Sequence, residues 1–264
     1  MRNVLYYFLD HKKINGTLFY CFEYFLICKR YEKDILFHIC NISEKDLIMV
    51  KEVLKERYVF ELRFLDDVRP LNSIQEIYNA VSVKTLILDL HSFNRTNMFI
   101  KNEILCFSNE NHTKVRSDFK KISYYGFYDY QAYDFRQMLK LNFSAMRLDP
   151  GPEDDAVLVS SRLYNYHEIE LPEEIKHKKV ITKTQNEHTA RLFNSFDTLF
   201  YFHSDFDTNN RLIPECFYYG KKIIVKINDK FNDSIKLRLD DINENGLKNY
   251  ILDENDLLVK DFLA

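Results

Sequence analysis

The stretch 197–225 constrains the fold of this chain most. The apolar run 198–202 is rich in aromatic residues and bounded by polar ones, which predicts a buried strand. A polar loop follows, then a short helix over 211–220 and a second apolar strand over 222–227. The order strand, polar loop, helix, strand is typical of an α/β sheet.

Two residues support the predicted helix of this stretch. Pro214 suits a first helical turn, where its missing N–H needs no partner. Gly220 suits the C′ position, which requires a left-handed backbone.

The rest of the chain repeats the alternation of strands and helices. The predicted helices include 18–30, a helix from Ser43 to about residue 58, and 186–194. Further strands are predicted at 4–9, 35–39, 60–64, 85–90, 104–107, 143–148, 156–160, 180–182 and 250–252. This alternation argues for parallel sheets with helices on both faces.

The acidic, proline-containing segment 149–155 is the clearest linker. It divides the chain into predicted domains 1–149 and 150–264. A chain of 264 residues is long enough for two small domains.

Composition narrows the classes of function. With 46% hydrophobic and 15% aromatic residues the chain can build a sizeable core, and the net charge of −3 carries no general nucleic-acid signature. Glycine is scarce, and neither a G-x-G-x-x-G motif nor a P-loop is found. The five cysteines lie mostly in apolar runs without metal-ligand spacing, so we expect a reduced, cytoplasmic protein. No apolar run reaches the length of a transmembrane helix.

Arg211 and Glu215 carry the strongest candidate chemistry. The predicted loop places Arg211 and backbone N–H groups at the carboxyl end of a strand, where an anion is favoured. Glu215 lies one helical turn further on the same face. An arginine that binds phosphate and a carboxylate that binds two sugar hydroxyls would together recognise a nucleotide sugar. The alternative is an i,i+4 surface pair beside an ordinary turn.

The run 214–225, PECFYYGKKIIV, resembles the C-terminal nucleotide-sugar motif of GT-B-fold glycosyltransferases. The resemblance implies two Rossmann-like domains with parallel sheets facing a central cleft, and a Glu215 that holds the donor ribose. Many retaining members carry another glutamate seven residues earlier, where this chain has Thr208 with Asp207 beside it. This departure leaves the stereochemical outcome open.

The resemblance also assigns candidate roles elsewhere. Arg162 resembles the strand-end arginine that meets the donor phosphate, and Arg211 is the candidate that stabilises the leaving diphosphate. The remaining donor-binding candidates come from the loop after the first strand and from the polar loop after 198–202. They are Asn15, Gly16, Thr17, His203, Asp207 and Asn210.

His91 directly follows the predicted strand 85–90. In a parallel sheet this position opens on the ligand-binding edge, and GT-B enzymes often have a histidine or an acidic residue there. His91 is therefore a candidate base or hydrogen-bonding group for the acceptor hydroxyl. The alternative is a partly exposed loop histidine, which we favour for His112.

The expected donor is a nucleoside diphosphate sugar, with no cofactor and no catalytic metal. The run 205–207 matches a D-x-D motif in spacing only, so metal use stays open. Three functions remain: sugar transfer to a glycan or small acceptor, sugar transfer to modified (hydroxymethylated) DNA as in some phages, and a non-catalytic nucleotide-binding module. The basic and aromatic segment 114–133 suits DNA modification, whereas the net negative charge opposes it.

Overall fold

The computed structural model describes residues 2–7, 14–31, 34–73, 76, 84–87, 103–108, 121–126, 140–148, 154–161, 170–182, 190–203, 211–227 and 232–264. The chain forms two compact units, Met1–Met146 with Ile251–Ala264, and Arg147–Tyr250. The division into domains 1–149 and 150–264 stays a prediction, and the compact units differ from it in that Ile251–Ala264 belongs with the first unit.

The first unit is built on a six-stranded sheet in the order β3-β2-β1-β4-β5-β6, and all neighbouring strands are parallel. This is the strand order of a doubly wound, Rossmann-like sheet. Its order reverses between β1 and β4, so the carboxyl ends of these two strands form the switch point. The strands are β1 (Arg2–Tyr7), β2 (Leu36–Cys40), β3 (Val68–Leu71), β4 (Lys84–Ile87), β5 (Glu103–Ser108) and β6 (Lys121–Gly126).

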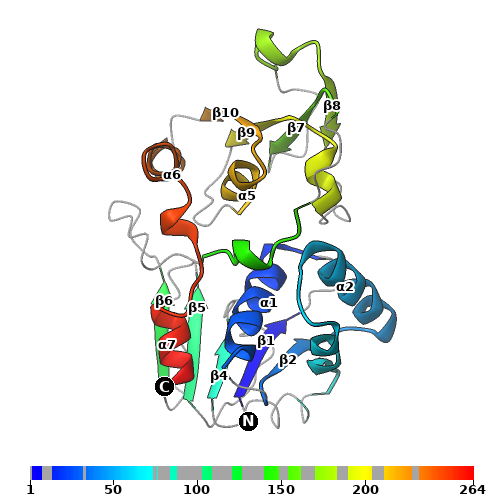
Figure 1. Ribbon diagram of the computed structural model, residues 1–264, viewed down its shortest axis with the longest axis vertical. Helices are drawn as coiled ribbons and strands as arrows, with labels where there is room; N and C mark the ends of the chain where they lie inside the picture. Colours follow the sequence, from blue (N-terminus) through cyan, green and yellow to red (C-terminus); the bar gives the residue numbers. More distant parts are fainter. Residues whose placement is uncertain are drawn as a thin grey trace. The chain divides into compact units, whose positions relative to one another are not determined.

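Helix α1 (Gly16–Lys29) is the centre of this unit. Its residues from Leu18 to Lys29 are all buried, as expected for a helix that is apolar on every side. On one side Phe22 and Phe25 pack on Phe37 of β2, with ring centroids 5.9 and 5.8 Å apart. On another side α1 contacts α7 (Leu257–Leu263), and both helices lie over the sheet in Figure 1. The predicted helix 18–30 is confirmed, with a start two residues earlier.

Helix α2 (Glu44–Arg57) is capped as predicted, because the Ser43 hydroxyl accepts a 3.1 Å hydrogen bond from the Asp46 amide. The prediction of a strand at 60–64 is wrong. This region forms the 3-10 helix η1 (Leu62–Asp67), and the third strand begins only at Val68. Phe60 packs edge-on against Phe22 on α1, and the chain turns through η1 before it joins the sheet at Val68.

Two other predicted strands are also absent from the described residues. The segment 143–148 contains the 3-10 helix η3 (Phe143–Ala145), and η7 (Lys248–Tyr250) precedes a single bridge between Leu141 and Ile251. Both segments hold apolar side chains, whose pattern predicts strands, but each forms only an isolated bridge, Met146 with Tyr58 and Ile251 with Leu141.

A buried carboxylate ties α1 to two other segments. Glu23 is fully buried in the middle of the helix. Its Oε1 accepts a hydrogen bond from the Tyr58 hydroxyl, and its Oε2 accepts one of 3.1 Å from the Asn142 backbone amide. Arg57 donates from Nε to the Tyr58 hydroxyl at 3.3 Å and lies 4.1 Å from the centre of the Phe19 ring.

The second unit is built on a four-stranded parallel sheet in the order β10-β9-β7-β8. The strands are β7 (Ala156–Ser161), β8 (Lys179–Thr182), β9 (Thr198–His203) and β10 (Lys222–Ile227), and the switch point lies between β7 and β9. The other elements among the described residues of this unit are η5 (Glu173–Ile175), η6 (Ala190–Asn194), α5 (Leu212–Tyr218), α6 (Asn232–Asn245) and η7. The predicted parallel α/β organisation is therefore confirmed in both units.

Charged side chains hold the amino ends of these strands together. Lys178 forms ion pairs with Asp155 and Asp197, and these three residues directly precede β8, β7 and β9. The apolar core lies further along the strands, where Val157 and Phe200 pack against Ile175 of η5.

Candidate functional site

The carboxyl edge of the second sheet leads into helix α5, which has the ends that the sequence predicts. Arg211 is its N-cap, in αR conformation, and Pro214 lies in its first turn. At the other end the Lys221 amide donates to the Cys216 carbonyl at 2.9 Å, and the Gly220 amide donates to the Phe217 carbonyl at 3.1 Å. These two bonds form a Schellman motif, and Gly220 has the required positive φ of 71°.

Arg211 and Glu215 form an ion pair through Nε and Oε1 on one face of α5. The pair is not on the surface, because Arg211 is 8% exposed and Glu215 is 4% exposed. The alternative of an ordinary surface pair therefore does not describe this site. Removing two charges from water is unfavourable, and their attraction offsets this only with good geometry and further hydrogen bonds.

The chemistry of this pair follows from its groups. The guanidinium of Arg211 is planar and permanently charged, with five N–H donors, and the carboxylate of Glu215 has several acceptor positions. A guanidinium suits phosphate oxygens, and a carboxylate suits sugar hydroxyls. At the end of α5, burial raises the pKa of the Tyr218 hydroxyl above its ordinary value.

The candidate residues of the first unit lie at the start of α1. Asn15 is the N-cap, and its Oδ1 accepts a 3.2 Å hydrogen bond from the Leu18 amide. Gly16 and Thr17 belong to the first turn of the helix, and all three candidates are half-buried. Because α1 follows β1, this turn lies at the carboxyl edge of the first sheet, beside the switch point.

The other candidates fall outside the described residues. His91, Arg162, Asp207 and Asn210 lie there, and of His203 only the backbone is described, at the end of β9. In sequence Arg162 directly follows β7, which pairs with β9 through Ser161 and Phe202. Of the predicted donor residues, the structure brings together Arg211 and Glu215.

Sequence reasoning assigned no role to Glu23, although it is a buried polar residue of the first unit. A signal was present, because Glu23 is the one acidic residue within the apolar run of α1. Its contacts with Tyr58 and Asn142 come from distant parts of the chain, and spacing alone does not predict them.

Among the described side chains no group of three or more His, Cys, Asp or Glu is placed to hold a metal ion. Within the same residues no helix combines the length and apolar character needed to cross a bilayer. Comparisons of the chain with models of known families, with curated proteins and with solved structures gave no match.

Proposed function

We propose that this protein is a GT-B-type glycosyltransferase that moves a sugar from a nucleoside diphosphate donor to an acceptor hydroxyl without a catalytic metal. The observation that carries the proposal is the buried Arg211–Glu215 pair behind β9, a strand that flanks the switch point of a parallel sheet. Ligands of such sheets bind at this edge. The two Rossmann-like sheets are compatible with the proposed two-domain fold.

In the proposed reaction the acceptor oxygen forms a bond to the anomeric carbon, and the bond from that carbon to the diphosphate breaks. The nucleoside diphosphate leaves with the electron pair, and the acceptor proton passes to His91. Arg211 and Arg162 stabilise the negative charge that builds on the leaving phosphate, and Glu215 accepts hydrogen bonds from the ribose. Asn15, Gly16 and Thr17 contribute from the first unit.

The ion pair gives Arg211 a fixed orientation before the donor binds. Holding Nε against Glu215 orients the planar fork, so less conformational entropy is lost when a phosphate is bound. Such preorganised charge is most effective where it meets charge that develops in the transition state.

A second candidate is a nucleotide-binding or interaction module without catalysis. The burial of both side chains favours it, because a pair this enclosed has a structural role whether or not a ligand binds. In this case nucleoside diphosphates bind, but no sugar is released from the donor.

Calorimetry with UDP, GDP, ADP and CDP, followed by turnover of labelled nucleotide sugars, tests the proposal. Arg211→Lys keeps the charge but loses the fork, so turnover should fall at least about 10-fold while diphosphate affinity falls less than about 5-fold. Arg191→Lys, an exposed change in the same unit, is the matched control. Wild-type turnover in Arg211→Lys would remove Arg211 from the reaction. Diphosphate binding without any turnover would favour the non-catalytic module.

A further inference from the structure

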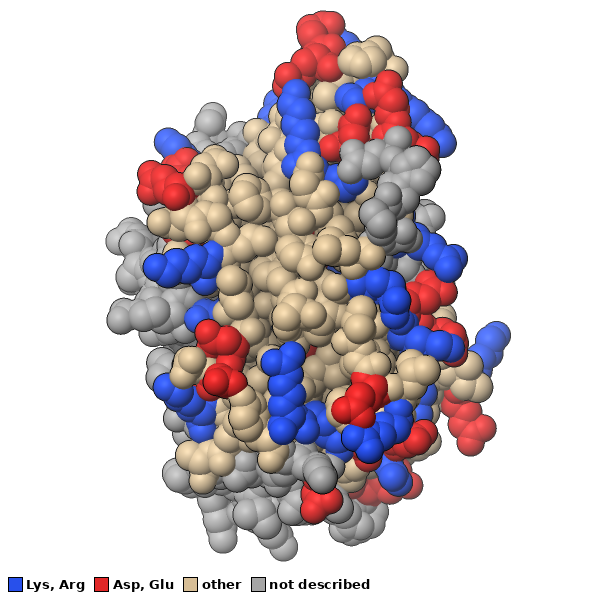
Figure 2. All heavy atoms as spheres, in the orientation of Figure 1, with Lys and Arg blue, Asp and Glu red and all other residues tan. Residues whose placement is uncertain are grey.

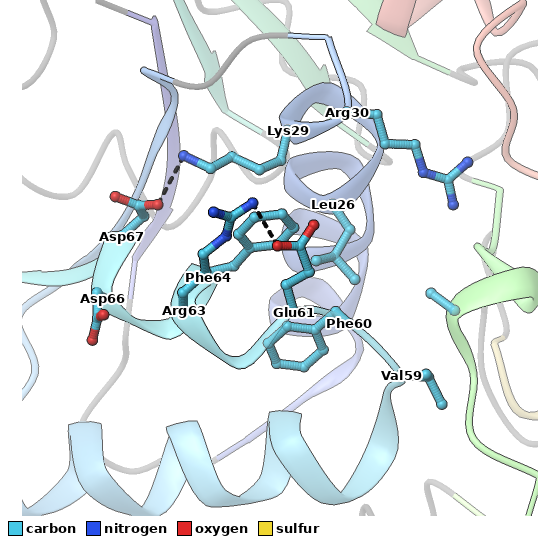
Figure 3. A pocket seen from close by; sticks show the side chains of 11 residues that line it. Leu26, Lys29, Arg30, Val59, Phe60, Glu61, Arg63, Phe64, Asp66 and Asp67 are labelled. Atoms are coloured by element: carbon cyan, nitrogen blue, oxygen red, sulfur yellow. Dashed lines mark ion pairs between the residues drawn. The ribbon is translucent and has the colours of Figure 1, made fainter.

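The first unit contains a hollow of about 670 Å³. It lies between the end of α1 and the segment that holds η1, as Figure 3 shows. Lys29 ends α1, and Asp67 directly precedes β3, so the hollow lies at the amino ends of the strands. The carboxyl edge, with the first turn of α1, is at the opposite end of the sheet. The lining residues are Leu26, Lys29, Arg30, Val59, Phe60, Glu61, Arg63, Phe64, Asp66, Asp67 and Ala145.

Aromatic rings form part of the wall, and packing holds them in place. The Phe60 ring meets the buried Phe22 ring edge-on, with centroids 5.2 Å apart and planes at 74°. Two cations lie over the Phe64 ring, Lys29 Nζ at 5.7 Å and Arg63 Cζ at 5.8 Å from its centre. Rings fixed in this way lose little conformational entropy when a ligand covers them.

The charges around the hollow are balanced. In the depth Lys29 pairs with Asp67 at 2.8 Å and donates to the Ile35 carbonyl at 3.2 Å. At the rim Arg63 pairs with Glu61 at 2.6 Å, with side chains 74% and 58% exposed. With Arg30 and Asp66, which also line the hollow, the lining contains three cationic and three anionic side chains (Figure 3). In the lower part of Figure 2, blue and red side chains lie near one another among uncharged ones.

We propose that this hollow binds a neutral saccharide. A charged ligand is attracted by one partner of each ion pair and repelled by the other, so balanced charge selects against it. A sugar hydroxyl both donates and accepts hydrogen bonds, and it can therefore bond to guanidinium, ammonium and carboxylate groups without separating the pairs. The apolar face of the sugar ring covers Phe60, and the volume is that of a small-ligand site.

This site goes beyond the proposed sugar transfer. It needs no nucleotide, and it lies at the edge of the sheet opposite to the switch point. A protein that holds a glycan here can retain a polymeric acceptor, but binding itself does not depend on catalysis.

Saturation-transfer NMR on the full chain, without nucleotide, tests the proposal. The neutral probes are methyl glucoside, methyl galactoside and N-acetylglucosamine, and the charged probes are glucosamine and glucuronate, which share the same ring. At least one neutral probe should bind with a Kd on the order of 1–10 mM, as expected for a small polar ligand. The charged probes should bind at least about 3-fold more weakly.

Variants then locate the binding. Phe60→Leu should weaken the neutral probe about 2- to 10-fold, the contribution expected of an aromatic face. Glu61→Gln removes a rim anion and should shift preference toward glucuronate by about 2- to 5-fold, whereas Arg63→Gln should shift it toward glucosamine by a similar factor. The exposed pair Glu173 and Lys176 in the second unit supplies matched controls, Glu173→Gln and Lys176→Gln, which should change nothing.

Three results would each overturn the site. One is no binding of any neutral probe up to about 50 mM, well above the expected Kd. Another is unchanged binding in a Phe60→Leu protein with a wild-type circular dichroism spectrum. The third is a charge preference that Glu61→Gln and Arg63→Gln leave unmoved. Because no nucleotide is present, loss of the proposed donor site leaves these outcomes unaffected.

Discussion

Two buried glutamates, Glu23 on α1 and Glu215 on α5, lie on helices that follow switch-point strands of two parallel sheets. Their surroundings differ. Glu23 accepts hydrogen bonds from the Tyr58 hydroxyl and from a backbone amide, whereas Glu215 is paired with the guanidinium of Arg211. The Glu23 carboxylate joins α1 to two other segments through hydrogen bonds. The Glu215 carboxylate instead pairs with the permanent positive charge of Arg211 at the N-terminus of α5.

The difference follows from the helices themselves. Helix α1 is long and buried on all sides, so packing is sufficient to hold it. Helix α5 spans only Leu212–Tyr218, and a helix this short is marginal without side-chain contacts and a C-terminal cap. Helix α5 therefore combines buried apolar residues, among them Ile213 and Cys216, with a buried charged pair and a C-terminal cap.

Glu215→Gln should have the largest effect on stability. It leaves the buried Arg211 charge without its paired anion, which costs about 3–5 kcal/mol in free energy of unfolding. Urea unfolding monitored by circular dichroism measures the loss. As a control, the double change Arg211→Met and Glu215→Leu removes both charges and should stay within about 1 kcal/mol of wild type. A loss under about 1 kcal/mol for the single change would mean that the pair behaves like a surface pair.

Acid should weaken the first unit through His38 of β2. Burial, assisted by the positive charge of Arg69, lowers the pKa of His38 from 6.5 to about 4. Above pH 6.5 the histidine is neutral in both folded and unfolded chains, so its contribution is fully present there. Between pH 6.5 and 4 the unfolded chain binds the proton first, and stability falls by about 3 kcal/mol.

The control for this pH dependence is His38→Gln, which does not titrate. The difference in free energy of unfolding between wild type and His38→Gln should change over this pH window and be constant above it. A constant difference from pH 7 to 4 would contradict the assignment of acid sensitivity to His38.

Glu23→Gln should have a smaller effect than Glu215→Gln. The amide of glutamine keeps only one acceptor oxygen, and its NH₂ group then faces either the Tyr58 hydroxyl or the Asn142 backbone amide. About one hydrogen bond is lost, which should lower the free energy of unfolding by about 1–3 kcal/mol. A double-mutant cycle with Tyr58→Phe should show coupling between the two side chains. An effect of Glu23→Gln equal to that of Glu215→Gln would remove the contrast between the two carboxylates.

The N-cap of α1 should contribute less again. Asn15→Ala removes the acceptor for the Leu18 amide and should lower stability by about 1 kcal/mol, as measured by thermal unfolding. Asn15→Ser, which retains a capping oxygen, is the control and should stay near wild type. If Asn15→Ala also lowers donor affinity while Asn15→Ser does not, the cap is part of the donor site.

Gly220→Ala should show the smallest effect. An added Cβ meets no atom within 4 Å, so only the positive φ of 71° opposes the change. Placing alanine in the left-handed region costs about 1–2 kcal/mol, and the lower entropy of the unfolded chain offsets about half of it. We expect a net loss of about 0.5–1 kcal/mol by urea unfolding. No loss would show that the Schellman end of α5 tolerates a β-carbon.

Much of the fold was predictable because its signals are local. Strand β10 and the ends of α5 follow from an apolar run, a proline and a glycine that act within a few residues of themselves. The predicted strand at 60–64 failed for the opposite reason. Phe60 of this segment packs on Phe22 of α1, far away in the sequence. The spacing of apolar residues over five positions does not predict which element they pack against.

The sequence by itself determined that strands and helices alternate, that the sheets are parallel and that Arg211 and Glu215 share one face of a short helix. Only the tertiary structure decided that this face is covered. Spacing along a helix fixes which side chains are neighbours, but burial depends on what packs against them. The same reason holds for the hollow beside Lys29, whose lining residues come from α1, from the segment around η1 and from Ala145. These lining residues come together through contacts between segments that are distant in the sequence, and a local sequence pattern does not predict such contacts.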